Sequence, residues 1–205
     1  AIRIFLAIMF WFIAYNAIEA FFTLFANKHL GMAESEGVRL LTQLSLLFVI
    51  FALPAGLIGG KIGRRKTIAT GIIFLGTCML LMAVLPVGLL TTLLFTLPVL
   101  GEVPVVGLIL MAAGIGWALI NINSLPMVVD LTDAVKIGTY TGLYYLFSTL
   151  AAILGPNING LFVELAGGDY SVIMFIGPVF MLLALLMIIG VRKGEAQNEP
   201  NINQV

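Results

Sequence analysis

The sequence predicts an all-α polytopic membrane protein, and three observations support this fold class. Hydrophobic residues make up 61% of the chain and charged residues only 10%, whereas soluble domains average about 45–50% apolar and about 25% charged. Six segments are apolar over the length of about 20 residues that a spanning helix needs. Basic residues gather in short stretches between these segments. A soluble fold would lack polar surface, so we expect an integral membrane protein.

The six predicted spans follow one another with short connections. In chain order they cover Ile4–Ala26, Val38–Gly59, Thr67–Leu89, Val105–Leu131, Thr139–Val163 and Ser171–Val191. Residues 89–104 either extend the third helix or lie at the membrane interface, since Pro98 and Pro104 argue against a further span. We predict a six-helix transmembrane domain over residues 1–192. The polar residues 193–205 are predicted to form a disordered cytoplasmic tail.

The distribution of basic residues predicts the orientation of the spans. Eight of the ten Lys and Arg fall on one side of the membrane: Arg3, Lys61, Arg64, Arg65, Lys66, Lys136, Arg192 and Lys193. Only Lys28 and Arg39 fall on the other. Short cytoplasmic loops carry the excess of Lys and Arg. We therefore expect both termini to be cytoplasmic and the protein to lie in the plasma membrane.

An internal repeat is expected within the six spans, because many transporters contain inverted three-helix repeats. The first and fourth spans share a pattern of one indole and two polar residues on about one helix face. These residues are Trp11, Asn16 and Glu19 in the first span, and Trp117, Asn121 and Ser124 in the fourth. The pattern predicts that the first helix of each triplet lines a cavity, the second flanks it and the third faces lipid.

Glu19 is the most costly polar residue of the first span, because a carboxylate at the bilayer centre costs about 2.5–3.5 kcal/mol on insertion scales. No Lys or Arg lies at comparable depth elsewhere in the chain. Glu19 is therefore either protonated and bonded to a neighbouring helix, or it faces a wet cavity with Asn16. In the second case it binds substrate or carries a coupling proton.

Further polar groups lie in the fourth and fifth spans. We expect Asn121 to line the cavity beside Trp117, and Asn123, which faces another way, to bond a neighbouring helix. Tyr144 and Tyr145 lie about two turns inside the fifth span. There they predict an aromatic wall for a sugar-like or amphipathic ligand.

The sequence gives no support to an enzyme. It contains no HExxH, CxxC, P-loop or GxSxG motif, and its single cysteine is Cys78. We expect no cofactor and no metal. A formal net charge of zero gives no reason to expect a nucleic-acid partner.

The stretch AGLIGGKIGRRKT, residues 55–67, concentrates four basic residues between two uncharged spans. It resembles the cytoplasmic signature of the major facilitator superfamily, Gly-x-x-x-Asp-Arg-x-Gly-Arg-Arg/Lys, which lies between the second and third helices of each six-helix half. The matching positions are Gly56, Gly63, Arg64 and Arg65, with Lys61 as a conservative variant. Gly60 stands where the family has Asp. Gly56 and Gly60 also form a small-xxx-small pair, which predicts a close helix approach.

The resemblance covers the whole chain and implies helices seven to twelve of a transporter, with an N-terminal six-helix half as partner. Residues 114–164 also look like helices ten and eleven of the sugar–cation symporters, the sucrose–proton and glycoside–pentoside–hexuronide branch. The resemblance thus implies a lipid-embedded secondary active transporter that carries a sugar-like molecule with H⁺ or Na⁺ by alternating access.

The family's signature Asp takes part in a charge network that latches the cytoplasmic face, so Gly60 implies a weaker latch in this chain. We predict that Arg64 or Arg65 pairs with Asp130 or Asp133 when that face is closed. Two other functions stay open at this point. One is an efflux transporter of the same superfamily for drugs or metabolites, and the other is a self-contained six-helix membrane protein that acts as a homodimer.

Overall fold

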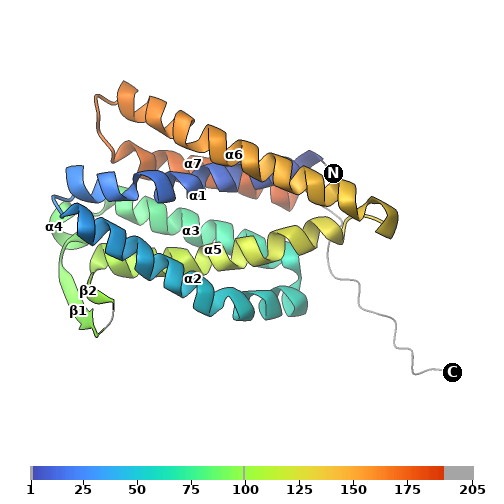
Figure 1. Ribbon diagram of the computed structural model, residues 1–205, viewed down its shortest axis with the longest axis horizontal. Coiled ribbons are helices and arrows are strands. Elements are labelled where there is room, and N and C mark those ends of the chain that lie inside the picture. Colours follow the sequence, from blue (N-terminus) through green and yellow to red (C-terminus); the bar gives the residue numbers. More distant parts are fainter. Residues whose placement is uncertain (1, 99, 192–205) are drawn as a thin grey trace.

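The computed structural model describes residues 2–98 and 100–191, and in this part the chain forms a bundle of long helices (Figure 1). The long helices are α1 (Ile2–Lys28), α2 (Glu34–Ile62), α3 (Arg64–Val84), α5 (Val105–Val129), α6 (Ile137–Leu165) and α7 (Val172–Ile189). These six are long and apolar enough to span a membrane. The predicted six-helix fold is confirmed, whereas the predicted tail, residues 193–205, lies outside the described residues.

The two ends of the bundle differ in their connections (Figure 1). At one end, called here the basic end, α2 meets α3 beside Lys61 and Arg64, and α5 meets α6 beside Lys136. At the other, called here the hairpin end, the short helix α4 (Val87–Leu90) leads into the strands β1 (Leu93–Leu97) and β2 (Gly101–Pro104). The basic end lies at the right of Figure 1 and the hairpin end at the left.

The helices interlock as two inverted three-helix repeats. The first helix of the first triplet, α1, packs mainly against α6 and α7. The first helix of the second triplet, α5, packs mainly against α2 and α3. Each triplet thus places its first helix against the second and third helices of the other, as an approximate two-fold axis between the repeats requires.

This interlocking puts α1 and α5 at the centre of the bundle. In the most apolar 18-residue window of α1, 56% of the residues are buried, against 17% in α2. Trp11, Phe22 and Phe25 of α1 are fully buried in the main core. By contrast, α2 and α6 leave apolar faces uncovered, with Leu53 73% and Ile153 58% exposed.

The segment between α3 and α5 does not extend the third helix, which was one of the two predicted alternatives. Helix α3 ends at Val84, well before the predicted Leu89, and the chain then forms α4 and an antiparallel hairpin in which Leu97 pairs with Gly101. The buried Gln43 of α2 holds this hairpin, because its Nε2 donates hydrogen bonds to the carbonyl oxygens of Leu100 at 3.0 Å and Glu102 at 3.2 Å. The all-α description therefore holds for the spans, and the hairpin is an addition outside them.

Candidate functional site

A pocket of about 480 Å³ lies between α1, α5 and α6, nearer to the basic end than to the hairpin end. Its lining combines one amide and three hydroxyl groups with apolar and aromatic surface. The lining residues are Phe12, Asn121, Ile122, Leu125, Pro126, Tyr144, Tyr145 and Ser148. Polar side chains inside otherwise apolar spans therefore face an open space. Of the predicted residues, Asn121, Tyr144 and Tyr145 meet here.

Tyr144 is fixed in the wall of this pocket. It is only 6% exposed, and its hydroxyl lies 3.0 Å from the Ser124 hydroxyl. Ser124 Oγ donates its single proton to the carbonyl oxygen of Asn121 at 2.7 Å. Tyr144 must therefore be the donor to Ser124, which leaves the lone pairs of the Tyr144 oxygen to accept a hydrogen bond.

Aromatic rings form the rest of the pocket wall. The Tyr145 ring, 55% exposed, meets Tyr144 edge to face at a centroid distance of 5.3 Å. Phe12 approaches Tyr144 from α1 at 6.4 Å. Such packing holds rings by edge-to-face attraction, so the buried Tyr144 ring is fixed while its more exposed neighbour Tyr145 also lines the pocket.

Trp117 lies behind the pocket rather than in its lining. Its indole stacks on Tyr15 with centroids 3.8 Å apart and ring planes at 5°, and Phe12 meets it edge to face at 5.2 Å. Tyr15 in turn interacts electrostatically with Glu19, one helical turn further on. A row of rings thus connects the pocket to Glu19. Sequence reasoning missed Tyr15, although its spacing of four residues from Glu19 was a usable signal.

The structure does not bring Asn16 and Glu19 into this pocket. Glu19 lies seven residues beyond Phe12 on α1, which is a rise of about 10 Å, and it is exposed on the surface of the bundle. Asn16 is half-buried beside Gly155 of α6, and its Nδ2 atom has no hydrogen-bond partner among the described residues. Within the described chain, no three His, Cys, Asp or Glu side chains gather as a metal site would need.

An ion pair crosses the basic end. Arg64 Nε donates a 2.7 Å hydrogen bond to Asp130 Oδ2, which joins the first residue of α3 to the residue that follows α5. The structure contains the predicted contact of Arg64 with Asp130, and its role as a latch of the closed cytoplasmic face stays a prediction. The other two residues considered for this pair do not take part in it. Asp133 is exposed in the link to α6, and Arg65 Nη1 donates a 2.7 Å hydrogen bond to the carbonyl oxygen of Val191.

Gly63 makes the sharp link between α2 and α3. Its φ of 97° lies in the region that only glycine adopts without strain. This conformation ends α2 and lets α3 begin at the next residue. The signature glycine at this position therefore has a backbone role, while Lys61 is exposed on the last turn of α2.

Gly59 of α2 packs tightly against the side chain of Asn123 on α5. A Cβ atom at Gly59 would collide with Oδ1 of the buried Asn123, whose Nδ2 donates a 3.0 Å hydrogen bond to the Ala55 carbonyl oxygen. The prediction that Asn123 bonds a neighbouring helix is confirmed. The predicted role of Gly60 in close packing is wrong, because a Cβ there would meet nothing within 4 Å, and Gly56 makes only an ordinary contact with α5.

The family model for the Major Facilitator Superfamily matches residues 4–204. The chain belongs to the Major Facilitator Superfamily. The resemblance that rests on the stretch 55–67 is thereby confirmed at the level of the family. No curated protein sequence matches the chain.

Solved structures of this superfamily share the fold. A POT family transporter in complex with 5-aminolevulinic acid matches with a TM-score of 0.73 and 17% identity, over 91% of this chain and 37% of its own length. The inward open xylose transporter XylE from E. coli matches with a TM-score of 0.71 and 16% identity, over 94% of this chain and 48% of its own. This chain therefore spans less than half of these transporters, which fits one six-helix half.

Membership of the superfamily explains the fold and the position of the basic loop. The chain has a transporter fold and is integral to a membrane. The superfamily signature occupies the link between the second and third helices of the unit, where Gly63 and Arg64 supply the turn and the ion pair.

Proposed function

We propose that this chain is the C-terminal half of a secondary active transporter that carries a sugar or glycoside together with H⁺ or Na⁺. The pocket between α1, α5 and α6 carries the proposal. Ligand sites place a few oriented polar groups in a mainly apolar wall, and this pocket offers the Asn121 amide, the Ser148 hydroxyl and the Tyr144 oxygen as an acceptor. These groups match the hydroxyls of a sugar, and the rings of Tyr144 and Tyr145 match its less polar faces.

A second six-helix half completes the transporter in this proposal. The helices α2 and α6 leave apolar residues such as Leu53 and Ile153 exposed on this half, and the second half would cover part of these faces. In alternating access the two halves rock about a site between them. The pocket described here is then one wall of the complete substrate site.

Glu19 is our candidate for the coupling residue. It lies on α1 beyond the pocket, exposed on the half-transporter and connected to the pocket by the rings of Tyr15 and Trp117. A carboxylate at this depth is stable where it faces a water-filled cavity between the halves. There it takes up the coupling ion or bonds substrate hydroxyls together with Asn16.

The basic end is cytoplasmic in this proposal, because short loops rich in Lys and Arg stay on the cytoplasmic side. The loop with Lys61, Arg64, Arg65 and Lys66 and the link with Lys136 both lie at this end. The membrane would be the plasma membrane. The pair of Arg64 and Asp130 would then close the cytoplasmic face and open when substrate is released there.

The test is transport by the full-length protein in proteoliposomes, with a panel of labelled sugars and imposed H⁺ or Na⁺ gradients. We expect Asn121→Ala to raise the KM for the transported sugar, since one hydrogen bond to the ligand is lost. Glu19→Gln should abolish accumulation driven by the gradient and leave exchange of internal for external sugar in place. The matched control is Glu164→Gln, which removes a carboxylate at the end of α6 away from the pocket.

Two results would overturn the proposal. Accumulation that is unchanged in Glu19→Gln would remove Glu19 from coupling. Transport of amphipathic drugs but of no sugar would assign the pocket to efflux, for which the apolar side chains of Phe12, Ile122 and Leu125 would then be the determinants.

A further inference from the structure

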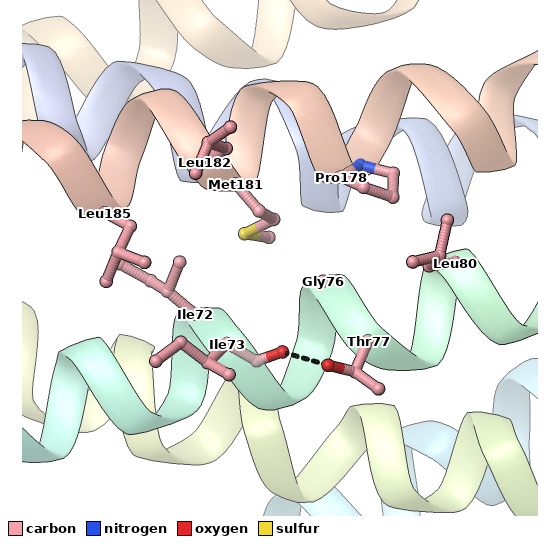
Figure 2. Close-up of a pocket in the computed structure, with 9 residues that line it drawn as sticks. All are labelled: Ile72, Ile73, Gly76, Thr77, Leu80, Pro178, Met181, Leu182 and Leu185. Atoms are coloured by element: carbon pink, nitrogen blue, oxygen red, sulfur yellow. Dashed lines mark hydrogen bonds between the residues drawn. The ribbon is translucent and has the colours of Figure 1, made fainter.

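An apolar groove of about 170 Å³ separates α3 from α7 (Figure 2). Its α3 side consists of Ile72, Ile73, Gly76, Thr77 and Leu80, and its α7 side of Pro178, Met181, Leu182 and Leu185. The hydroxyl of Thr77 donates a 2.8 Å hydrogen bond to the Ile73 carbonyl oxygen, as the dashed line in Figure 2 shows. Thr77, the one polar side chain of the groove lining, thus makes its hydrogen bond within its own helix. The remaining surface of the groove is apolar and suits an apolar ligand.

A second hollow, of about 220 Å³, lies between the same two helices at the basic end. Its lining consists of Arg65, Lys66, Ala69 and Ile189. The two hollows follow one line along α3, because residues 66, 69, 73, 76 and 80 repeat at steps of three or four and so share a helix face. From Lys66 to Leu80 the rise is about 21 Å, which exceeds the roughly 15 Å of hydrocarbon in one leaflet.

The charge of the second hollow is positive. Lys66 is exposed and has no hydrogen bond or ion pair with any described residue. Arg65 is anchored at the rim by its bond to the Val191 carbonyl oxygen, and Arg3 of α1 lies against Gly190 nearby. Among the described residues, the carboxylates of the basic end are Asp130, already paired with Arg64, and Asp133, and neither lines the hollow.

We propose that the groove between α3 and α7 is a binding site for one anionic phospholipid. Its acyl chain lies along the apolar groove, and its phosphate group lies at Lys66, with Arg65 at the rim. Basic hollows between spanning helices favour anionic headgroups. A neutral lipid would leave the charge of Lys66 unmatched, and a free phosphate would leave the groove empty. Neither α3 nor α7 lines the pocket between α1, α5 and α6, so the site is separate from the proposed substrate site.

The test is native mass spectrometry of the full-length purified protein in detergent, titrated with phosphatidylglycerol or with phosphatidylcholine of the same acyl chains. We expect the wild type to retain phosphatidylglycerol preferentially. Lys66→Gln should weaken this retention about five-fold, the effect of one basic side chain at an anionic surface, and leave phosphatidylcholine unaffected. Ile73→Trp, which fills the apolar groove, should weaken the retention of both lipids.

Lys61→Gln is the matched control. It removes the same charge at the same end of the bundle, from α2 and outside both hollows. Retention of phosphatidylglycerol that stays at the wild-type level in Lys61→Gln supports the site. An equal loss in Lys61→Gln and Lys66→Gln would overturn it, because the attraction would then be diffuse. A wild type without preference for phosphatidylglycerol would overturn it too.

Discussion

Arg64 and Asp130 are separated by 66 positions in the chain, yet Arg64 Nε donates a 2.7 Å hydrogen bond to Asp130 Oδ2. Their side chains are only 23% and 28% exposed, so solvent screens this pair less than a fully exposed one. The pair connects the start of α3 to the end of α5. Gly60 leaves the signature without its Asp, and Asp130 supplies a carboxylate to the arginine from the other repeat.

Removing the carboxylate should loosen the basic end. We predict that Asp130→Asn lowers the free energy of unfolding by roughly 1 kcal/mol, which is near the upper end of the range for partly exposed ion pairs. In the full-length transporter this change should speed hydrogen–deuterium exchange at the start of α3 and shift the population toward the conformation open at this end. The matched control is Asp133→Asn, because Asp133 is exposed and carries no ion pair in the described structure. Equal exchange in both variants would contradict the role of the pair.

A substitution at Gly63 tests the backbone conformation of the link between α2 and α3 rather than its charge. With φ at 97°, a side chain at this residue is strained, and such strain costs of order 1–3 kcal/mol. Gly63→Ala should therefore lower the thermal unfolding temperature of the protein in detergent. Gly60→Ala is the comparison, because Gly60 is helical and a Cβ there has open space. It should leave stability unchanged or raise it, since alanine favours a helix over glycine by up to about 1 kcal/mol.

The spans and the ion pair were predictable because both rest on one-dimensional signals. Apolar runs interrupted by charge place the helices to within a few residues, and charges at the ends of the two repeats predict the meeting of Arg64 and Asp130. The site was only partly predictable. Tyr144 and Asn121 were found from their polarity within spans, but polarity alone did not tell which polar residues share a pocket. Glu19 has the same kind of signal and lies outside it.

Other features depended on contacts that the sequence does not encode locally. Tyr15 looked like one more aromatic residue of α1, and its role follows only from the indole of Trp117 stacked on it. The hairpin of β1 and β2 was missed because its leucine-rich first strand has the composition of a span. The small-residue pattern indicated the correct helix but the wrong glycine, since the rotation of α2 turns Gly59, not Gly60, toward Asn123.

We predict that Asp169 makes the stability of the hairpin end sensitive to acid. The backbone N–H of Ser171 donates a 2.8 Å hydrogen bond to Asp169 Oδ1, and this bond, with help from His29 at 3.9 Å, lowers the pKa of the carboxyl. A lowered pKa in the folded state stabilises the fold above the unfolded value of about 3.9. That stability is lost as the pH falls through the lower, folded value.

Asp169→Asn should therefore reduce the difference between the unfolding temperatures measured at neutral pH and below about pH 4. His29→Gln should reduce it less, because the larger cause of the shift, the bond from Ser171, remains. Both are measured by thermal unfolding in a detergent that does not titrate. If the unfolding temperature of Asp169→Asn fell in acid as much as that of the wild type, the acid sensitivity would come from other groups.

The contact of Gly59 with Asn123 predicts a specific energetic coupling. Gly59→Ala places a methyl group against Asn123 Oδ1 and pushes that side chain away from the Ala55 carbonyl oxygen. Overpacking of this kind lowers the free energy of unfolding by about 1–3 kcal/mol. Asn123→Ala alone loses the hydrogen bond to the Ala55 oxygen, a cost of about 1–3 kcal/mol for a buried group left unsatisfied. The double variant should be less destabilised than the sum of the two, because the smaller residue 123 leaves room for the methyl group.

A double-mutant cycle on unfolding in mixed detergent micelles measures this coupling, which should be about 0.5–3 kcal/mol for residues in direct contact. The control cycle pairs Gly60→Ala with Asn123→Ala, and its effects should add, since a Cβ at Gly60 meets nothing within 4 Å. Additive effects in both cycles would mean that α2 and α5 are not in contact at Gly59. Because the Arg64–Asp130 pair lies just beyond this contact, a loosened Gly59 should also speed exchange at the start of α3.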